Sequence, residues 1–276
     1  MTLETKDLIC SGAFRVTERL SHDLIAKALF VGERVADGTI VSVAYVAACA
    51  VPLERLRARF CYVVPGVSEV LCLDTLDRPS APPYAPEVVL VEARPKGGSL
   101  SEMQVPLPAA TAARLASGVC RIALDARSKG VVLEGLAPAV VFGEGRLSDW
   151  HLTGIAPRAR LFLGVRQNVR TLDGHWSSLD NPQDIYVAPE EVVNPDPDAT
   201  NTYLIGLLLA YALEGRHPFA RKDGECSQFE LMSMDRPLPF TAPPAFAGLL
   251  ERVLVADPLR RMKLDDLATE LEDLCR

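Results

Sequence analysis

The segment from Thr200 to Phe219, TNTYLIGLLLAYALEGRHPF, contains the apolar run that most constrains the fold. Between Tyr203 and Leu213 there is no charged residue and no proline. A surface helix would carry polar residues on one face in every turn, whereas this run is apolar all the way round. It is also shorter than the roughly 20 residues that a membrane-spanning helix needs. We therefore predict a helix that is buried on every side and against which other elements pack.

The flanking residues predict where this helix begins and ends. Asp198, Thr200 and Asn201 are candidate N-caps, because short polar side chains can accept hydrogen bonds from the first free backbone N–H groups. Gly215 suits the left-handed residue that follows a last helical turn, and Pro218 cannot continue a helix.

Size and composition indicate a folded, soluble chain. Its 276 residues provide enough interior for one large domain or two lobes, and 49% of them are hydrophobic. The net charge of -7 argues against a nucleic-acid partner, which would require a concentrated basic face. No N-terminal signal and no run of membrane length is present, so we expect a cytoplasmic protein without a membrane partner.

The cysteines indicate neither a disulfide framework nor a metal site. They are odd in number, scattered, and never spaced as C-x-x-C. We therefore expect all of them to be small core residues in a reducing compartment, with no metal bound. The seven are Cys10, Cys49, Cys61, Cys72, Cys120, Cys226 and Cys275.

Apolar runs and β-branched residues predict strands and one helix in the first ~105 residues. The expected strands are Ala26–Val31, Thr39–Val46, Val67–Leu73 and Val88–Glu92, and the expected helix is Leu53–Cys61. Lys96–Ser99 (KGGS) is predicted to be a linker, because the hydrophobic pattern changes from strand-like to helical after it.

Helical periodicity dominates the rest of the chain. We expect helices at Ala109–Leu124 and Pro244–Val255, and a third that carries Leu264 and Leu274. The simplest architecture is an α+β fold with a β-rich lobe over residues 1–95 and a mainly helical lobe over 96–276. A cleft between two such lobes is where ligands usually bind.

Three segments in this order resemble a known family. Tyr186–Glu190 (YVAPE) resembles an A-P-E motif, the apolar helix resembles a buried central helix, and Asp257–Arg261 (DPLRR) resembles a D-P-x-x-R segment. The chain resembles a eukaryotic-like, bacterial Ser/Thr protein kinase domain over nearly its whole length, which implies a two-lobed fold. The resemblance also implies that Glu190 pairs with Arg261, and that Asn201 replaces the aspartate that holds the catalytic loop.

The positions that bind nucleotide phosphates in this family are replaced here. The Gly-rich loop corresponds to Leu20–Ala28, where Ser21, Asp23 and Ala26 stand in place of the three glycines. The strand lysine that grips the phosphates corresponds to Ala44.

The catalytic loop, H-R-D-x-x-x-x-N in the family, corresponds to residues within Gly130–Val140. The histidine, the base aspartate, the lysine and the magnesium-binding asparagine are replaced by Leu133, Gly135, Ala137 and Val140. Asp149 alone remains, in Asp149–His151 (DWH), where the family has D-F-G. One carboxylate is a poor magnesium site. The bulky Leu133 and Trp150 stand where the family stacks an apolar column between the lobes.

The resemblance is thus to a pseudokinase, and we predict a non-enzymatic scaffold or allosteric regulator that needs no cofactor. The expected partner is a protein, such as an active Ser/Thr kinase or a phosphoprotein. An alternative is an atypical phosphotransferase in which Asp149 and Lys27 bind metal and phosphate. The simpler interpretation is that Asp149 is a solvated loop aspartate and that Lys27 is a solvent-facing lysine on a strand. A third option is a cleft that binds another small molecule.

The segment from Leu152 to Asp184 is a candidate docking surface. Arginines beside exposed aromatic residues suit an acidic or phosphorylated protein. An ordered hairpin whose arginines face solvent explains the composition equally well. The residues concerned are Arg158, Arg160, Arg166, Arg170 and Trp176. His151, His175 and His217 have no partners at metal-ligand spacing and read as surface or capping residues, and no G-x-S-x-G motif supports a hydrolase.

Overall fold

The computed structural model describes residues 3–20, 27–46, 49, 51–76, 86–133, 135–158, 186–192, 196–219 and 240–275. These residues form two compact units. The N-terminal unit contains the described residues up to 63, 67–95 and 156–158, and the C-terminal unit contains 64–66, 96–155 and the described residues from 186 onward. The main division falls between Pro95 and Lys96, but two short segments belong to the opposite unit.

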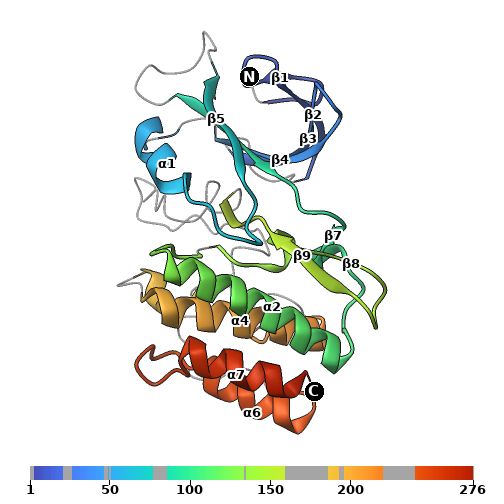
Figure 1. Cartoon of the computed structure of the whole chain (residues 1–276), viewed down its shortest axis with the longest axis vertical. Coiled ribbons are helices and arrows are strands. Elements are labelled where there is room, and N and C mark those ends of the chain that lie inside the picture. The colour runs from blue at the N-terminus through green and yellow to red at the C-terminus, as the bar shows by residue number, and fades with distance from the viewer. Residues whose placement is uncertain are drawn as a thin grey trace, which may run out of the picture. The chain divides into compact units, whose positions relative to one another are not determined.

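The N-terminal unit is built on a six-stranded antiparallel sheet with strand order β1-β2-β3-β4-β6-β5 (Figure 1). Its strands are β1 (Leu8–Ile9), β2 (Phe14–Arg19), β3 (Lys27–Arg34), β4 (Ile40–Val46), β5 (Val70–Leu76) and β6 (Glu87–Ala93). Helix α1 (Leu53–Phe60) packs against β5. The four expected strands and the expected helix are confirmed, with shifts of one to three residues at most ends.

Strands β1 and β2 are absent from the sequence prediction. β2 reads FRVTER, so only Phe14 and Val16 are apolar and buried while charged residues fill the other face. β1 has two residues and no periodicity of its own. The edge of a sheet tolerates such polar strands, and the hydrophobic pattern alone does not reveal them.

The two faces of this sheet bury different apolar clusters, because neighbouring side chains of a strand point to opposite sides. On one face, Val41, Val43 and Tyr45 of β4 pack with residues of the first three strands and β6. On the other face, Ala44 and Val46 pack with buried residues of α1.

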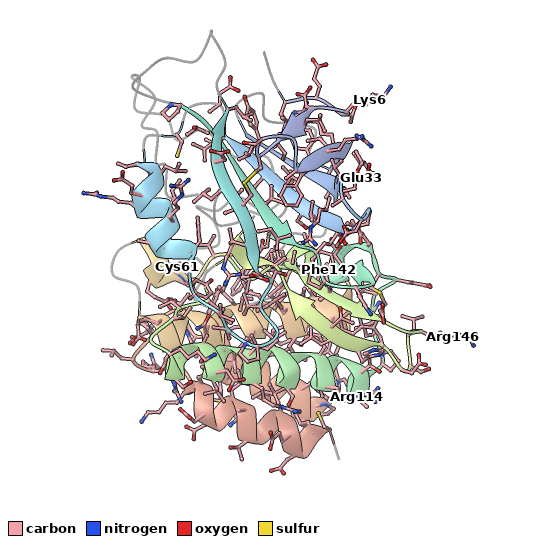
Figure 2. All side chains as sticks on the ribbon, turned by 45° about the horizontal axis from the view of Figure 1, so that its top comes forward. Lys6, Glu33, Cys61, Arg114, Phe142 and Arg146 are labelled. Carbon is pink, nitrogen blue, oxygen red and sulfur yellow. A yellow bond between two sulfur atoms is a disulfide. The ribbon has the colours of Figure 1, made fainter. Side chains whose placement is uncertain are left out.

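Cys10 and Cys72 form a disulfide, so the prediction that all seven cysteines are unpaired is wrong (Figure 2). Cys10 follows β1 and Cys72 lies in β5, which are the two ends of the strand order. The bond therefore links the two edges of the curved sheet. The partners are 62 residues apart in the chain, and spacing rules cannot recognise a pair that only the closure of the sheet brings together.

The C-terminal unit contains a three-stranded sheet and four described α-helices (Figure 1). Its sheet has the order β7-β8-β9. The elements are β7 (Gly98–Ser99), η1 (Leu100–Glu102), α2 (Ala109–Ser128), η2 (Pro138–Val140), β8 (Val141–Glu144), β9 (His151–Ile155), η3 (Pro189–Val192), α4 (Pro197–Glu214), α6 (Pro244–Val253) and α7 (Leu264–Leu274). Helix α2 packs against α4 and α7, and α4 also packs against α6. Among the described helices, none has the length and apolar character to span a bilayer.

Helix α4 is the buried central helix that the sequence predicts. Every residue from Ala199 to Ala210 is buried. Gly206 lies so close to Val253 of α6 that a Cβ atom there would overlap it. The helix ends as expected at Gly215, which has a φ of 69°. The predicted N-caps are wrong, because Asp196 accepts hydrogen bonds from the backbone N–H groups of Asp198 and Ala199 at 3.1 and 3.2 Å.

Arg127 joins three helices of the C-terminal unit and makes their packing sensitive to pH. It donates to both carboxylate oxygens of Asp265 at 2.7 Å and to Asp198 at 3.0 Å. These hydrogen bonds hold the pKa of Asp265 below its usual value. A depressed pKa adds stability above the carboxyl pKa of the unfolded chain, and that stability is lost as pH falls through the folded-state pKa.

We expect Asp265→Asn to lower the free energy of unfolding by up to ~1 kcal/mol at neutral pH, because the pair is largely exposed. The difference from the unsubstituted chain should shrink as pH falls into the carboxyl range. Urea unfolding at several pH values measures both effects. Asp266→Asn, at an exposed neighbouring position, is the matched control. An Asp265→Asn effect that does not change with pH would contradict this explanation.

Candidate functional site

The face of the N-terminal sheet that carries Ala44 is the first part of the candidate site. In the register of β4 and β6, Ser42 lies opposite Glu92 and Ala44 lies opposite Leu90. Residues two apart on a strand share a face, so these four side chains point to the same side. Ala44 and Leu90 are fully buried in the apolar cluster against α1. At the position that corresponds to the family's lysine, the interior is therefore apolar.

Arg158 brings a positive charge to this same face. Its Nη1 lies 3.6 Å from Oε1 of Glu92, and both side chains are buried, at 1% and 0% exposure. Its Nη2 donates to the backbone oxygen of Tyr62 at 2.7 Å, and its guanidinium carbon lies 4.0 Å from the centroid of the Tyr62 ring. The expectation that Arg158 is exposed for docking is therefore wrong, because its charge is compensated inside the N-terminal unit.

The remaining docking and phosphate-loop predictions are untested. Arg160, Arg166, Arg170 and Trp176 lie outside the described residues, as do Ser21, Asp23 and Ala26. Lys27 opens β3, where its backbone lies opposite Val46, but its side chain is not among those described.

Four positions that correspond to functional residues of the catalytic loop, those of Leu133, Gly135, Ala137 and Val140, lie in the C-terminal unit and carry no ionisable group. Leu133 and Ala137 are fully buried, and Val140 is 5% exposed at the end of η2. Gly135 has a φ of 75°, a backbone conformation that favours glycine. None of these four side chains can accept a proton from a hydroxyl group or bind a metal ion.

Asp149 is exposed, and its carboxylate accepts a hydrogen bond within its own turn. Arg146 of this turn and Arg114, which contacts it, are labelled in Figure 2. Oδ1 of Asp149 accepts a hydrogen bond from the backbone N–H of Arg146 at 2.6 Å. The turn is fixed to α2, because Thr111 and Arg114 both donate to the backbone oxygen of Ser148, at 3.1 and 2.9 Å. This geometry agrees with the simpler reading of Asp149 as a loop aspartate.

Trp150 follows this turn and is buried at 1% exposure. Its ring occupies the space that a side chain at Gly143 of β8 would need, since a Cβ atom there would overlap the indole. Within the part of the chain that the structure describes, its Nε1 has no hydrogen-bond partner. Leu133 is buried as well, and the apolar column that we expect the two residues to form stays a prediction.

Glu190 and Arg261 form a buried, bidentate ion pair, as the resemblance implies. The two nitrogen–oxygen distances are 2.5 and 3.0 Å. Arg261 also donates to the backbone oxygen of Ala199 at 2.7 Å, and its guanidinium lies 4.7 Å from the ring centroid of Tyr203. Thr200 donates to Glu190 at 3.1 Å. The pair therefore holds the segment before α4 and the loop before α7 against the central helix.

Asn201 and His217 lie in different settings from those expected. Asn201 lies inside α4 and is 1% exposed, so it does not cap the helix. Its Oδ1 has no hydrogen-bond partner among the residues that the structure describes. His217 is buried at 5% exposure, so it is not a surface residue. Its Nδ1 accepts a hydrogen bond from the backbone N–H of Phe219 at 3.3 Å.

A β-rich unit with one helix, followed by a helical unit built around α4, defines an α+β, protein kinase-like fold of the bacterial Ser/Thr type. Three solved structures share it over nearly the whole chain: the kinase domain of Mycobacterium tuberculosis PknI and two double mutants of that domain. The identities are 13%, 13% and 14%, the TM-scores are 0.62, 0.63 and 0.65, and each covers 99–100% of this chain and 100% of the other. No protein-family model and no curated protein matches this sequence. At such identities the likeness concerns the fold alone.

Proposed function

We propose that the chain is a catalytically inactive pseudokinase that acts as a scaffold or allosteric partner of another signalling protein. An active Ser/Thr kinase or a phosphoprotein is the partner class that the fold favours. Phosphoryl transfer depends on positioning and on the neutralisation of phosphate charge. At the positions that supply these functions in kinases, this sequence has Ala44, Gly135, Ala137 and Val140.

The observation that carries the proposal is the buried pair of Arg158 and Glu92. Glu92 of this pair lies on the same face of the sheet as Ala44, because the Ser42–Glu92 pair is two residues along the strands from the Ala44–Leu90 pair. A cation that binds phosphate must be within reach of the ligand. Arg158 is 1% exposed and its charge is already matched by a buried carboxylate, so it is poorly placed to replace the lost lysine.

The C-terminal unit supports the same conclusion. A magnesium ion in such a site relies on carboxylate and amide oxygens together with the substrate phosphates. Val140 offers no oxygen from its side chain, and Asp149 is held by the N–H of Arg146. The alternative in which Asp149 and Lys27 serve an atypical phosphotransferase therefore has no specific contact in its favour among the described residues.

We expect ATP or ADP with magnesium to leave the thermal unfolding midpoint unchanged. A nucleotide present at 100 times its dissociation constant would add ~2.7 kcal/mol of stability, which a thermal shift assay detects readily. Stabilisation by nucleotide, together with radiolabel transfer that Asp149→Ala abolishes, would overturn the proposal and favour the phosphotransferase.

A matched variant separates two reasons for the absence of binding. Replacing a buried ion pair with apolar residues of similar volume is often neutral or stabilising, so Glu92→Leu with Arg158→Met should stay folded. If nucleotide does not stabilise this variant either, the lack of phosphate-binding side chains is sufficient to explain the absence of binding. If it alone is stabilised by nucleotide, the ion pair excludes a ligand that the fold could still accommodate.

The interaction role needs a separate measurement. The chain should change the phosphotransfer rate of an active Ser/Thr kinase domain from the same cell while incorporating no phosphate through any activity of its own. A bovine serum albumin control at equal concentration corrects for non-specific effects. No change in rate and no complex on gel filtration with any such kinase would argue against the kinase-partner form of the proposal.

A further inference from the structure

Cys10, Cys72 and Asp74 bring three metal-ligating groups together in the N-terminal unit. One donor atom from each, the two Sγ atoms and a carboxylate oxygen, lie within 4.8 Å of one another. All three side chains are partly buried, so solvent can reach them. This cluster contains none of the positions that correspond to catalytic residues, and it does not depend on the proposed function.

The fold explains why these residues meet. Cys72 and Asp74 are two apart on β5, so their side chains point to the same side of the strand. Cys10 comes from the other edge of the sheet, in a turn where Cys10, Ser11 and Gly12 have φ values of 51°, 55° and 85°. Two of these are non-glycine residues in the left-handed region, which costs about 1–3 kcal/mol each and persists only where the surroundings hold it.

We propose that the reduced form of this cluster is a binding site for a divalent ion of the zinc class. Two thiolates and a carboxylate are ligands that Zn²⁺ accepts, and a water molecule would complete the tetrahedron. With Zn–S distances of about 2.3 Å, tetrahedral donors lie roughly 3.5–4 Å apart, which small rotations of these side chains provide. Oδ1 of Asp74 accepts the N–H of Thr75 at 2.9 Å, and this bond orients the carboxylate and leaves its second oxygen for the ion.

The metal and the disulfide exclude each other. A dithiol reductant transfers two electrons and two protons to the Cys10–Cys72 bond and becomes a disulfide itself. Zn²⁺ then replaces the two thiol protons, which are released to solvent. Re-oxidation of the two thiolates by a small-molecule disulfide restores the bond and expels the ion. Reduction and metal binding therefore replace the disulfide between the two sheet edges by a link through the metal ion.

Cobalt(II) is the probe, because thiolate-to-cobalt charge transfer gives a near-ultraviolet absorption that oxygen and nitrogen ligands do not. The full reduced chain should bind one cobalt ion with this absorption, zinc should displace it, and the oxidised chain should show none. Cys72→Ser should abolish the absorption. Asp74→Asn should weaken cobalt binding at least ~10-fold, since even groups that only orient ligands matter to this extent.

Two variants make the test decisive. Asp74→Asn keeps both cysteines and can be purified in the disulfide form before reduction, so it separates ligand loss from misfolding. Cys61→Ser removes an exposed free thiol elsewhere and should leave the binding unchanged. The proposal is overturned if the reduced chain gives no charge-transfer absorption. It is also overturned if affinity is the same before and after Asp74→Asn, as it would be for thiols in an unfolded chain.

Discussion

Replacing Arg261 by alanine is expected to lower the free energy of unfolding by about 3–5 kcal/mol, because it leaves Glu190 buried without its counter-charge. The same change removes the hydrogen bond to the backbone oxygen of Ala199 and the stacking on Tyr203. Urea denaturation monitored by circular dichroism measures the effect. Since α4 contacts the other helices of the unit, we expect the whole C-terminal unit to lose stability together.

Arg260→Ala is the matched control for this experiment. Arg260 is the adjacent residue, is exposed, and carries the same charge. Its replacement should change the stability by no more than about 0.5 kcal/mol, as is usual for surface positions. Equal effects of the two substitutions would show that the Glu190–Arg261 pair contributes nothing beyond net charge.

Removal of the Cys10–Cys72 bond should destabilise the N-terminal unit by about 4 kcal/mol, as loop-closure entropy predicts for two residues this far apart in the chain. The double variant Cys10→Ser with Cys72→Ser makes the change permanent. Thermal unfolding with and without a reductant should differ in the unsubstituted chain and should coincide in the double variant. The effect should be measured without metal, because the proposed site would restore part of the stability.

Cys61→Ser and Cys120→Ser test whether the effect is specific to this bond. Cys61 is an exposed free thiol, and burial raises the pKa of the Cys120 thiol to about 12, which makes it unreactive. Both single variants should keep the full response to reductant. An unsubstituted chain that melts at the same temperature in both conditions would disprove a stabilising role for the bond.

The sequence predicts best those elements whose own residues determine their state. Helix α4 is predictable because a run from Tyr203 to Leu213 without a charge can be stable only in an interior. Its N-cap was missed although Asp196 precedes Pro197, and proline at the first helical position is a recognised start signal. The pairing of Glu190 with Arg261 follows from motif resemblance, which supplies a contact that periodicity cannot.

Contacts between residues that are far apart in the chain form only in the folded protein, and the sequence pattern does not predict them. Arg158 lies in an arginine-rich segment, and composition favoured a surface position. The signal that points to its burial is Glu92, a carboxylate at the end of the apolar strand VVLVE, because a charge in such a strand needs a partner. Nothing in the sequence says which of the chain's cations supplies it.

The pair of Glu92 and Arg158 also determines what a lysine introduced at Ala44 would encounter. A lysine introduced at Ala44 would enter a face where the buried carboxylate of Glu92 is already paired with Arg158. The added lysine would then need a counter-charge of its own in a buried setting, where an uncompensated charge is strongly unfavourable. The buried pair of Glu92 and Arg158 thus makes Ala44 an unfavourable position for a lysine, and Ala44→Lys is expected to destabilise the N-terminal unit.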